Sequence, residues 1–223
     1  MPNGHAIELT DLPTMHPPIG AGMLHLFALP ALIRLSVDPT PLAITTMCRK
    51  IAVEWKARDG TPAQTINRVI GWANLQNHFV DFDTRVAQLP HTLGPQPLTE
   101  FAAIAIMALL VSDLERMVLN EVLQIGSGGD YYGMIDLIRF ECEVSGIRDA
   151  AFPSVAMARL REKTEQLLAH PIESGFVSVT TFAHPTTPPN GIIVHSFLHF
   201  VTRSATISGP ASKKRKKKKG KKK

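Results

Sequence analysis

The sequence has few cysteines, few aromatic residues and no hydrophobic run long enough to cross a membrane. Only Cys48 and Cys142 occur among 223 residues, which excludes a disulfide framework and a paired-cysteine metal site. The longest apolar runs, residues 23–37 and 101–111, are interrupted by polar residues or fall short of the roughly 20 residues that a span needs. No signal-peptide pattern precedes them. We therefore expect a soluble intracellular protein that needs no metal and no cofactor.

Basic residues are scarce everywhere except at the C-terminus. Ten of the 24 Lys and Arg residues lie in the last eleven positions, which leaves 14 basic against 19 acidic residues in the rest of the chain. The composition thus predicts a mildly acidic globule that carries a disordered, strongly basic tail. The basic residues of this tail are Lys213, Lys214, Arg215, Lys216, Lys217, Lys218, Lys219, Lys221, Lys222 and Lys223.

The tail is suited to binding polyanions without sequence specificity. On duplex nucleic acid, five phosphate contacts would make the binding constant depend on salt. The logarithm of the binding constant would fall with the logarithm of the salt concentration with a slope of about −4.5. On an anionic membrane, each basic residue would contribute about 1 kcal/mol. The same run matches a nuclear localisation signal, so an import receptor is a further expected partner in a eukaryotic or viral setting. We expect a nuclear location in that setting, and a cytoplasmic or nucleoid location in a bacterium.

The body is predicted to have an α+β fold in which a helical N-terminal half packs on a small C-terminal sheet with one covering helix. Hydrophobic residues make up 44% of the chain, which is typical of a globular protein. The predicted organisation is a loosely ordered arm over 1–21, a single body over 22–203 that is helical over 22–125 and mixed over 131–203, a hinge over 204–212 and the tail over 213–223.

Helix-start signals support the helical assignment of the N-terminal half. Thr40-Pro41 and Thr61-Pro62 each pair an N-cap residue with proline at the first helical position, and apolar residues follow at helical spacing. Residues 90–97 are predicted to be a Pro/Gly linker. A long helix is expected over 99–125, buried on every side in its first half and therefore central to the core.

The pattern changes after residue 130. Residues 134–144 alternate between apolar and charged side chains, which predicts one strand. Pro153-Ser154 marks the start of a helix that runs to about Ala169. Two β-branched and aromatic runs, 176–182 and 192–201, predict two more strands. The C-terminal part of the body is therefore expected to run strand, helix, strand, strand.

Three acidic residues and one lysine form the main candidate for a catalytic site. An acid-x-acid strand followed by a helix with a lysine could bind a divalent metal and activate water, and the residues concerned are Asp136, Glu141, Glu143 and Lys163. This arrangement resembles the core of the PD-(D/E)XK nucleases. The chain has Glu141-Cys142-Glu143 where that family has acid-x-Lys, and Asp136 falls on the opposite face of the predicted strand from both glutamates.

Other candidate sites are better explained as structural features. The loop Gly126-Ser127-Gly128-Gly129-Asp130 lacks the lysine of a P-loop and follows a predicted helix, so we interpret it as a helix stop and linker. His184, His195 and His199 lie close together in the predicted sheet. His195 and His199 would be about 13 Å apart along a strand, too far for one metal ion.

The sequence therefore favours a non-enzymatic structural or nucleic-acid-associated protein. Its body would bind a partner or form a homo-oligomer, and its tail would supply affinity for nucleic acid. Two alternatives remain open. One is a peripheral, matrix-like protein that binds anionic lipid through the tail. The other is a divalent-metal-dependent nuclease with a PD-(D/E)XK-like core.

Overall fold

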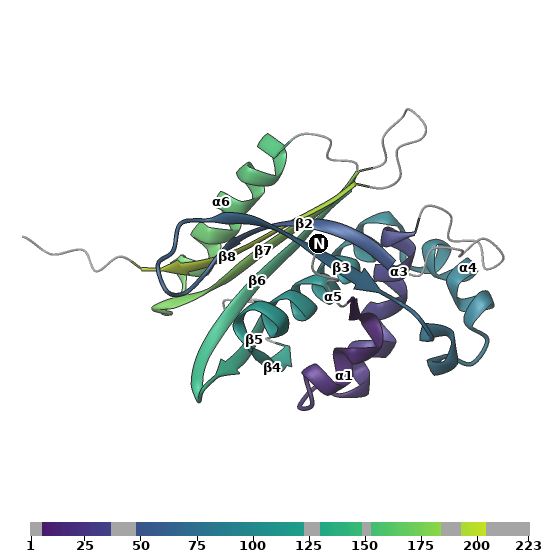
Figure 1. The fold of residues 1–223 in the computed structure, drawn as a ribbon. Coiled ribbons are helices and arrows are strands. Elements are labelled where there is room, and N and C mark those ends of the chain that lie inside the picture. Colours follow the sequence, from purple (N-terminus) through teal and green to yellow (C-terminus); the bar gives the residue numbers. More distant parts are fainter. Residues whose placement is uncertain (1–5, 37–47, 123–129, 149–152, 184–192, 204–223) are drawn as a thin grey trace, which may run out of the picture.

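The computed structural model describes residues 6–36, 48–122, 130–148, 153–183 and 193–203, and combines one mixed sheet of eight strands with helices on both of its faces (Figure 1). The strands are β1 (Ile7–Glu8), β2 (Cys48–Lys56), β3 (Gln64–Gly71), β4 (Val118–Val122), β5 (Tyr131–Ile135), β6 (Ile138–Arg148), β7 (Ser174–Ala183) and β8 (Ile193–Thr202). The helical elements are η1 (Leu9–Asp11), α1 (Leu12–Met15), α2 (Ala21–Met23), η2 (Leu24–Ala28), α3 (Leu29–Leu35), η4 (Leu75–His78), α4 (Phe82–Leu93), α5 (Pro95–Glu115) and α6 (Pro153–Ala169).

The strand order in the sheet is β1-β3-β2-β8-β7-β6-β5-β4. Strands β4, β5 and β6 form an antiparallel meander, and β6 then pairs in parallel with β7. A parallel pair needs a crossover connection, which α6 provides. Strand β8 joins the two halves of the sheet, because it pairs antiparallel with β7 and parallel with β2. The run from α5 to β7 thus has the order α-β-β-β-α-β.

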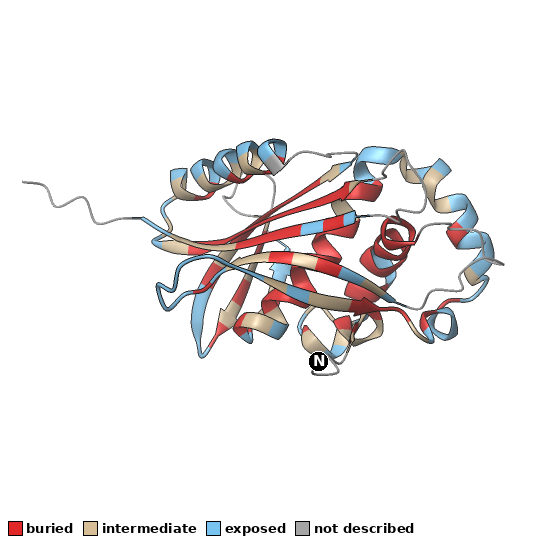
Figure 2. Cartoon of the chain, turned by 45° about the horizontal axis from the view of Figure 1, so that its top comes forward, coloured by how far each residue is buried: buried red, intermediate tan, exposed pale blue. Residues whose placement is uncertain are grey.

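Helix α5 lies at the centre of the core on one face of the sheet (Figure 1). All of its residues from Ala102 to Val111 are buried, and small side chains such as Ala105 and Ala108 let neighbouring elements approach closely. Helix α3 and strand β6 both pack against it. The uninterrupted apolar run 101–111 is too short for a membrane span, but the whole of α5 is long and apolar enough to cross a membrane by length and composition. Of its apolar window, 67% is buried inside the protein (Figure 2).

Helix α6 covers the other face of the sheet over β6, β7 and β8. Its apolar residues Ala156, Leu160 and Leu167 form a second cluster with side chains of β7 and β8. Its outer surface is exposed, as Figure 2 shows. The helix therefore has a buried side that faces the sheet and a solvent-facing side.

The N-terminal segment is packed where we expected a loosely ordered arm. Strand β1 pairs in parallel with β3, and Leu9 and Leu12 have no exposed surface. His16 is also fully buried and hydrogen-bonds to the backbone of both α5 and β4. Residues 7–16 are therefore part of the core, whereas residues 1–5 lie outside the part of the chain that the structure describes.

The two helices predicted from Thr-Pro signals are wrong within the described residues. Residues 48–56 and 64–71 form an antiparallel hairpin, β2 and β3, and the Asp59-Gly60 dipeptide lies in its connection. Ile51 and Val53 are two positions apart and both fully buried, as a strand requires. The apolar residues of this segment fit both a helical and an alternating period, and pairing with β8 favours the strand.

The long helix also has different ends from those predicted. Helix α4 occupies the first half of the predicted linker, residues 90–93, and α5 begins directly after Gly94, whose φ is +73°. Helix α5 ends at Glu115, because Arg116 adopts a left-handed conformation with φ +57°. The chain then continues as β4. Residues 123–129, which include the predicted helix stop, lie outside the described segments.

The C-terminal prediction is confirmed from β6 onward, but its first predicted strand, 134–144, is divided between β5 and β6. Strand β6, helix α6 and strands β7 and β8 follow one another as expected, and α6 has the predicted bounds. The fold as a whole is mixed α/β. Its sheet is larger than the small C-terminal sheet we expected, because β2 to β4 come from the part that we predict to be helical and β1 comes from the predicted arm.

Candidate functional site

Two acidic side chains lie next to each other, one directly before β5 and one on β6, on the face of the sheet that α6 covers. Asp130 directly precedes β5, and its backbone N–H donates to the carbonyl of Cys142 at 2.8 Å. Its carboxylate accepts a hydrogen bond from the N–H of Val144 at 2.8 Å. Glu143 lies between Cys142 and Val144 on β6, and its side chain is on the opposite face of the sheet from that of Cys142. The sheet thus fixes the two carboxyl groups as cross-strand neighbours.

Lys163 of α6 completes the cluster. Its Nζ donates to Glu143 Oε2 at 2.6 Å and lies 3.8 Å from Asp130 Oδ2. The side chains of Lys163 and Glu143 are only 13% and 6% exposed, whereas that of Asp130 is 40% exposed. The cluster is therefore desolvated at its lysine end and open to solvent at Asp130. We call these three residues the acid–lysine cluster.

Burial raises the pKa of Glu143. The hydrogen bond from Lys163 lowers that pKa, while the negative charge of Asp130 and a side-chain hydrogen bond with it raise it again. Each carboxyl group thus disfavours the ionisation of the other, while Lys163 favours the charged form of Glu143. A pair of acids held together in this way has an affinity for positive charge that a divalent cation could satisfy.

Two of the four predicted site residues are brought together, and two are not. Glu143 and Lys163 contact each other directly. Glu141 lies two residues along the same face, where its Oε1 is 3.6 Å from Arg139 and its buried Oε2 has no hydrogen-bond partner among the described residues. Asp136 is exposed in the turn between β5 and β6, with φ +48°, and takes no part in the cluster.

Asp130 is the residue that sequence reasoning missed. The alternating segment 134–144 is two strands and not one, because Asp136 and Leu137 both adopt left-handed conformations and reverse the chain. Strand β5 is therefore separate from β6, and Asp130 directly precedes it. The available signal was an acidic residue directly before the aromatic pair Tyr131-Tyr132.

Ser145 and Arg159 extend the cluster along β6 and α6. Ser145 lies two residues beyond Glu143 on the same face and is 1% exposed. Arg159 lies one helical turn before Lys163, and its Nε donates to Ser145 Oγ at 3.0 Å. Two cationic side chains of α6, Arg159 and Lys163, thus face the polar side chains of β6.

The remaining candidates have structural roles or lack partners for chemistry. His199 Nε2 lies 3.0 Å from Glu54, and burial lowers its pKa, whereas His195 on the same strand is exposed. Burial also raises the pKa of the Cys142 thiol, which makes it unreactive. His184 lies outside the described residues. Over the described ranges, no three His, Cys, Asp or Glu side chains are placed to hold a metal ion.

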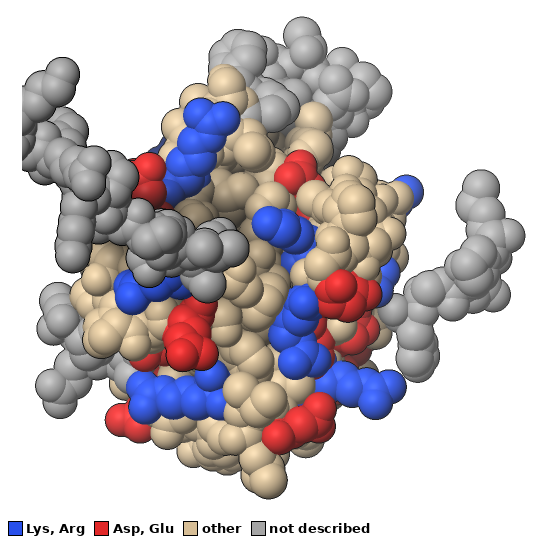
Figure 3. Space-filling view, turned by 90° about the vertical axis from the view of Figure 1, so that its left-hand side faces the viewer, with Lys and Arg blue, Asp and Glu red and all other residues tan. Residues whose placement is uncertain are grey.

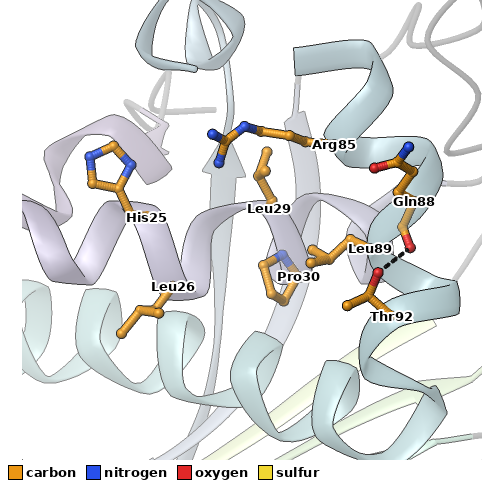
Figure 4. Close-up of a pocket in the computed structure, with 8 residues that line it drawn as sticks. All are labelled: His25, Leu26, Leu29, Pro30, Arg85, Gln88, Leu89 and Thr92. Carbon is orange, nitrogen blue, oxygen red and sulfur yellow. Dashed lines mark hydrogen bonds between the residues drawn. The ribbon is translucent and has the colours of Figure 1, made fainter. Parts of the chain in front are cut away.

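A shallow pocket of about 160 Å³ lies between η2, α3 and α4 (Figure 4). Its polar groups are engaged locally, since Thr92 donates to the carbonyl of Gln88 and Arg85 Nε donates to that of Val80. It therefore offers less for catalysis than the acid–lysine cluster. Its lining residues are His25, Leu26, Leu29, Pro30, Arg85, Gln88, Leu89 and Thr92.

Charges on the surface do not separate into patches on the face shown in Figure 3. Lys and Arg side chains alternate there with Asp and Glu side chains. Comparisons with protein-family models, with curated proteins and with solved structures found no match. The function of this chain is therefore inferred from the geometry and chemistry of its site.

Proposed function

We propose that this chain is a divalent-metal-dependent phosphodiesterase that acts on nucleic acid, with its centre at the acid–lysine cluster. One observation carries the proposal: Asp130, directly before β5, is a neighbour of Glu143 on β6, and Lys163 contacts both. A strand-borne acid pair with an ammonium group is the set of groups that the PD-(D/E)XK pattern assembles. The local order α-β-β-β-α-β supplies the separate strand for the first acid.

The departure from that pattern concerns the lysine. If Glu143 is the second acid, the lysine position of acid-x-Lys is occupied by Ser145. Helix α6 provides the amine instead, and it places Nζ 2.6 Å from Glu143. The chemistry requires a positive charge beside the acids and not a particular place in the sequence, so a lysine from the crossover helix serves the same purpose.

The donor set fits a cation of the Mg²⁺ type. Mg²⁺ keeps several water ligands and is usually held by one or two carboxylates together with substrate phosphate, so a set of three protein acids is not required. Asp130 and Glu143 are the residues that would hold it. When bound, such an ion would polarise the phosphoryl group and lower the pKa of a water molecule. Lys163 would stabilise negative charge that develops on the phosphoryl oxygens, in a partly desolvated site where this interaction is strong.

The test is cleavage of labelled oligonucleotides and plasmid in Mg²⁺ or Mn²⁺ by the full chain and by Glu143→Gln. The substitution keeps the shape of the side chain but removes its charge. We expect the rate to fall at least about 100-fold, because several kcal/mol of transition-state stabilisation depend on the bound ion. Glu165→Gln is the matched control, since it makes the same change at an exposed position of α6. Cleavage that needs no divalent ion, or that survives Glu143→Gln, would refute the proposal.

A second candidate function is the non-enzymatic one that the composition predicts. Ten cations in the last eleven residues favour polyanion binding by the tail, which lies outside the described residues. In the first proposal the same tail would hold the substrate near the site. In the second it would be the functional element itself, on nucleic acid or on an anionic, matrix-like membrane surface.

Deletion of residues 213–223 tests the role of the tail. For full-length protein on duplex DNA, we expect a log-affinity against log-salt slope of about −4.5 or steeper, and a slope near zero after deletion. Binding to vesicles with and without anionic lipid separates the membrane alternative. If the deleted chain binds all anionic targets as tightly as the full chain, the tail has no such function.

A further inference from the structure

A cation–aromatic pair lies on the same hairpin as the acid–lysine cluster. The guanidinium carbon of Arg139 lies 4.3 Å from the centre of the Tyr132 ring. Tyr132 pairs with Glu141 in the register of β5 and β6, so the two residues share a face. Arg139 lies two residues before Glu141 and is on that face as well. The stacked pair and the two acids Asp130 and Glu143 are therefore on one side of the hairpin.

The pair is held in position from two sides. The ring supports the guanidinium from below, and Glu141 Oε1 lies 3.6 Å from one of its nitrogens. At the same time 55% of the Arg139 side chain is exposed. A planar cation that is fixed on an aromatic ring and open on its outer side is a preformed platform for another flat group.

The distance from the platform to the acids matches a nucleic-acid strand. Tyr132 and Asp130 are two residues apart, about 7 Å along a strand, which is roughly two nucleotide rises of 3.4 Å. Glu141, whose Oε1 faces Arg139, stands on β6 between Arg139 and Glu143.

We propose that Tyr132 and Arg139 stack on an unpaired base, so that the substrate of this site is a single strand or an unpaired region of nucleic acid. This inference rests on the proposed function. Bases within a duplex are stacked on their neighbours and cannot present a face to a protein side chain, whereas unpaired bases stack on aromatic rings and on guanidinium planes. The tail contains no aromatic residue and contacts phosphates alone, so it cannot make this distinction.

The experiment compares two fluorescent oligonucleotides of equal length, one of thymidines and one abasic, by anisotropy with the full chain in EDTA. Both carry the same phosphates, so the contribution of the tail is the same for both. We expect the thymidine strand to bind at least about fivefold more tightly. Tyr132→Leu and Arg139→Lys should each bring the affinity ratio close to one, while Tyr132→Phe keeps the ring and should retain it.

The inference would be overturned if the unmodified protein bound the thymidine and abasic strands equally tightly. It would also be overturned if neither Tyr132→Leu nor Arg139→Lys changed the ratio of the two affinities. This result is independent of catalysis. Cleavage that depends on Glu143 together with a ratio of one would leave the proposed function standing without the platform. The opposite outcome is also distinguishable. If the thymidine strand binds more tightly than the abasic strand but Glu143→Gln cleaves as before, the platform stands and the phosphodiesterase proposal fails.

Discussion

Replacement of His16 by alanine is expected to lower the free energy of unfolding by about 3–5 kcal/mol. The ring is fully buried, and both of its nitrogens are bonded to distant backbone groups. Nδ1 accepts from the N–H of Leu119 on β4 at 3.0 Å, so Nε2 carries the proton and donates to the carbonyl of Ala108 on α5 at 3.1 Å. Alanine would leave a cavity and an unpaired N–H in the core.

Urea unfolding followed by circular dichroism measures this effect. His91→Ala is a suitable control, because His91 is exposed near the end of α4 and its removal should change stability by no more than about 0.5 kcal/mol. If His16→Ala behaves like the control, the N-terminal segment does not contribute to the core in solution. In that case residues 1–21 would be the loosely ordered arm that the sequence predicts.

The same histidine should make stability depend on pH. Burial lowers the pKa of His16 from 6.5 to about 4, so the unfolded chain binds the proton more readily than the folded one. The stabilisation is fully present above pH 6.5 and is lost as the pH falls from there to about 4, by roughly 3 kcal/mol in total. The loss of stability across this interval should be smaller in His16→Gln, which has no titrating ring.

The C-terminal half could be predicted because its local signals agree with one another. Proline at the start of α6 and the β-branched and aromatic runs of β7 and β8 each favour one kind of structure only. In residues 48–71 the signals conflict. Thr61-Pro62 favours a helix start, whereas Asp59-Gly60 favours a hairpin turn, and pairing of Val53 and Trp55 with β8 decided for strands. Tertiary pairing of this kind cannot be read from a local window.

The candidate site also contains residues that the sequence predicts and one that it does not. Glu143 and Lys163 belonged to the predicted constellation, since an acid on a strand and a lysine on the next helix are visible in the sequence. The sequence places Asp130 in the loop 126–130, and it places Asp136 on one strand with the glutamates because the turn at 136–137 has no clear signal. Two consecutive left-handed residues, one of them Leu137, have no glycine or asparagine signal to mark them.

A second large effect is expected at Gly146, where β6 passes α5. Its N–H donates to Glu100 Oε2 at 2.8 Å, and a Cβ added there would lie 2.4 Å from the carbonyl oxygen of Thr99 and 2.8 Å from its carbonyl carbon. Both atoms belong to the helix backbone, so a side chain cannot rotate away to relieve the overlap. We expect Gly146→Ala to lower the free energy of unfolding by about 3 kcal/mol.

Gly22→Ala is the matched control for this prediction. The same substitution in the short helix α2 would meet only Ile19 Cγ2 at 3.8 Å, an ordinary contact. Because alanine favours helix over glycine, stability there should stay the same or rise by up to about 1 kcal/mol. The entropy that the unfolded chain loses is the same in both variants, so the difference between them reports the close approach of α5 to β6. Equal unfolding midpoints would mean that helix and strand are further apart than the structure places them, and that α5 does not fix the strand that carries Glu143.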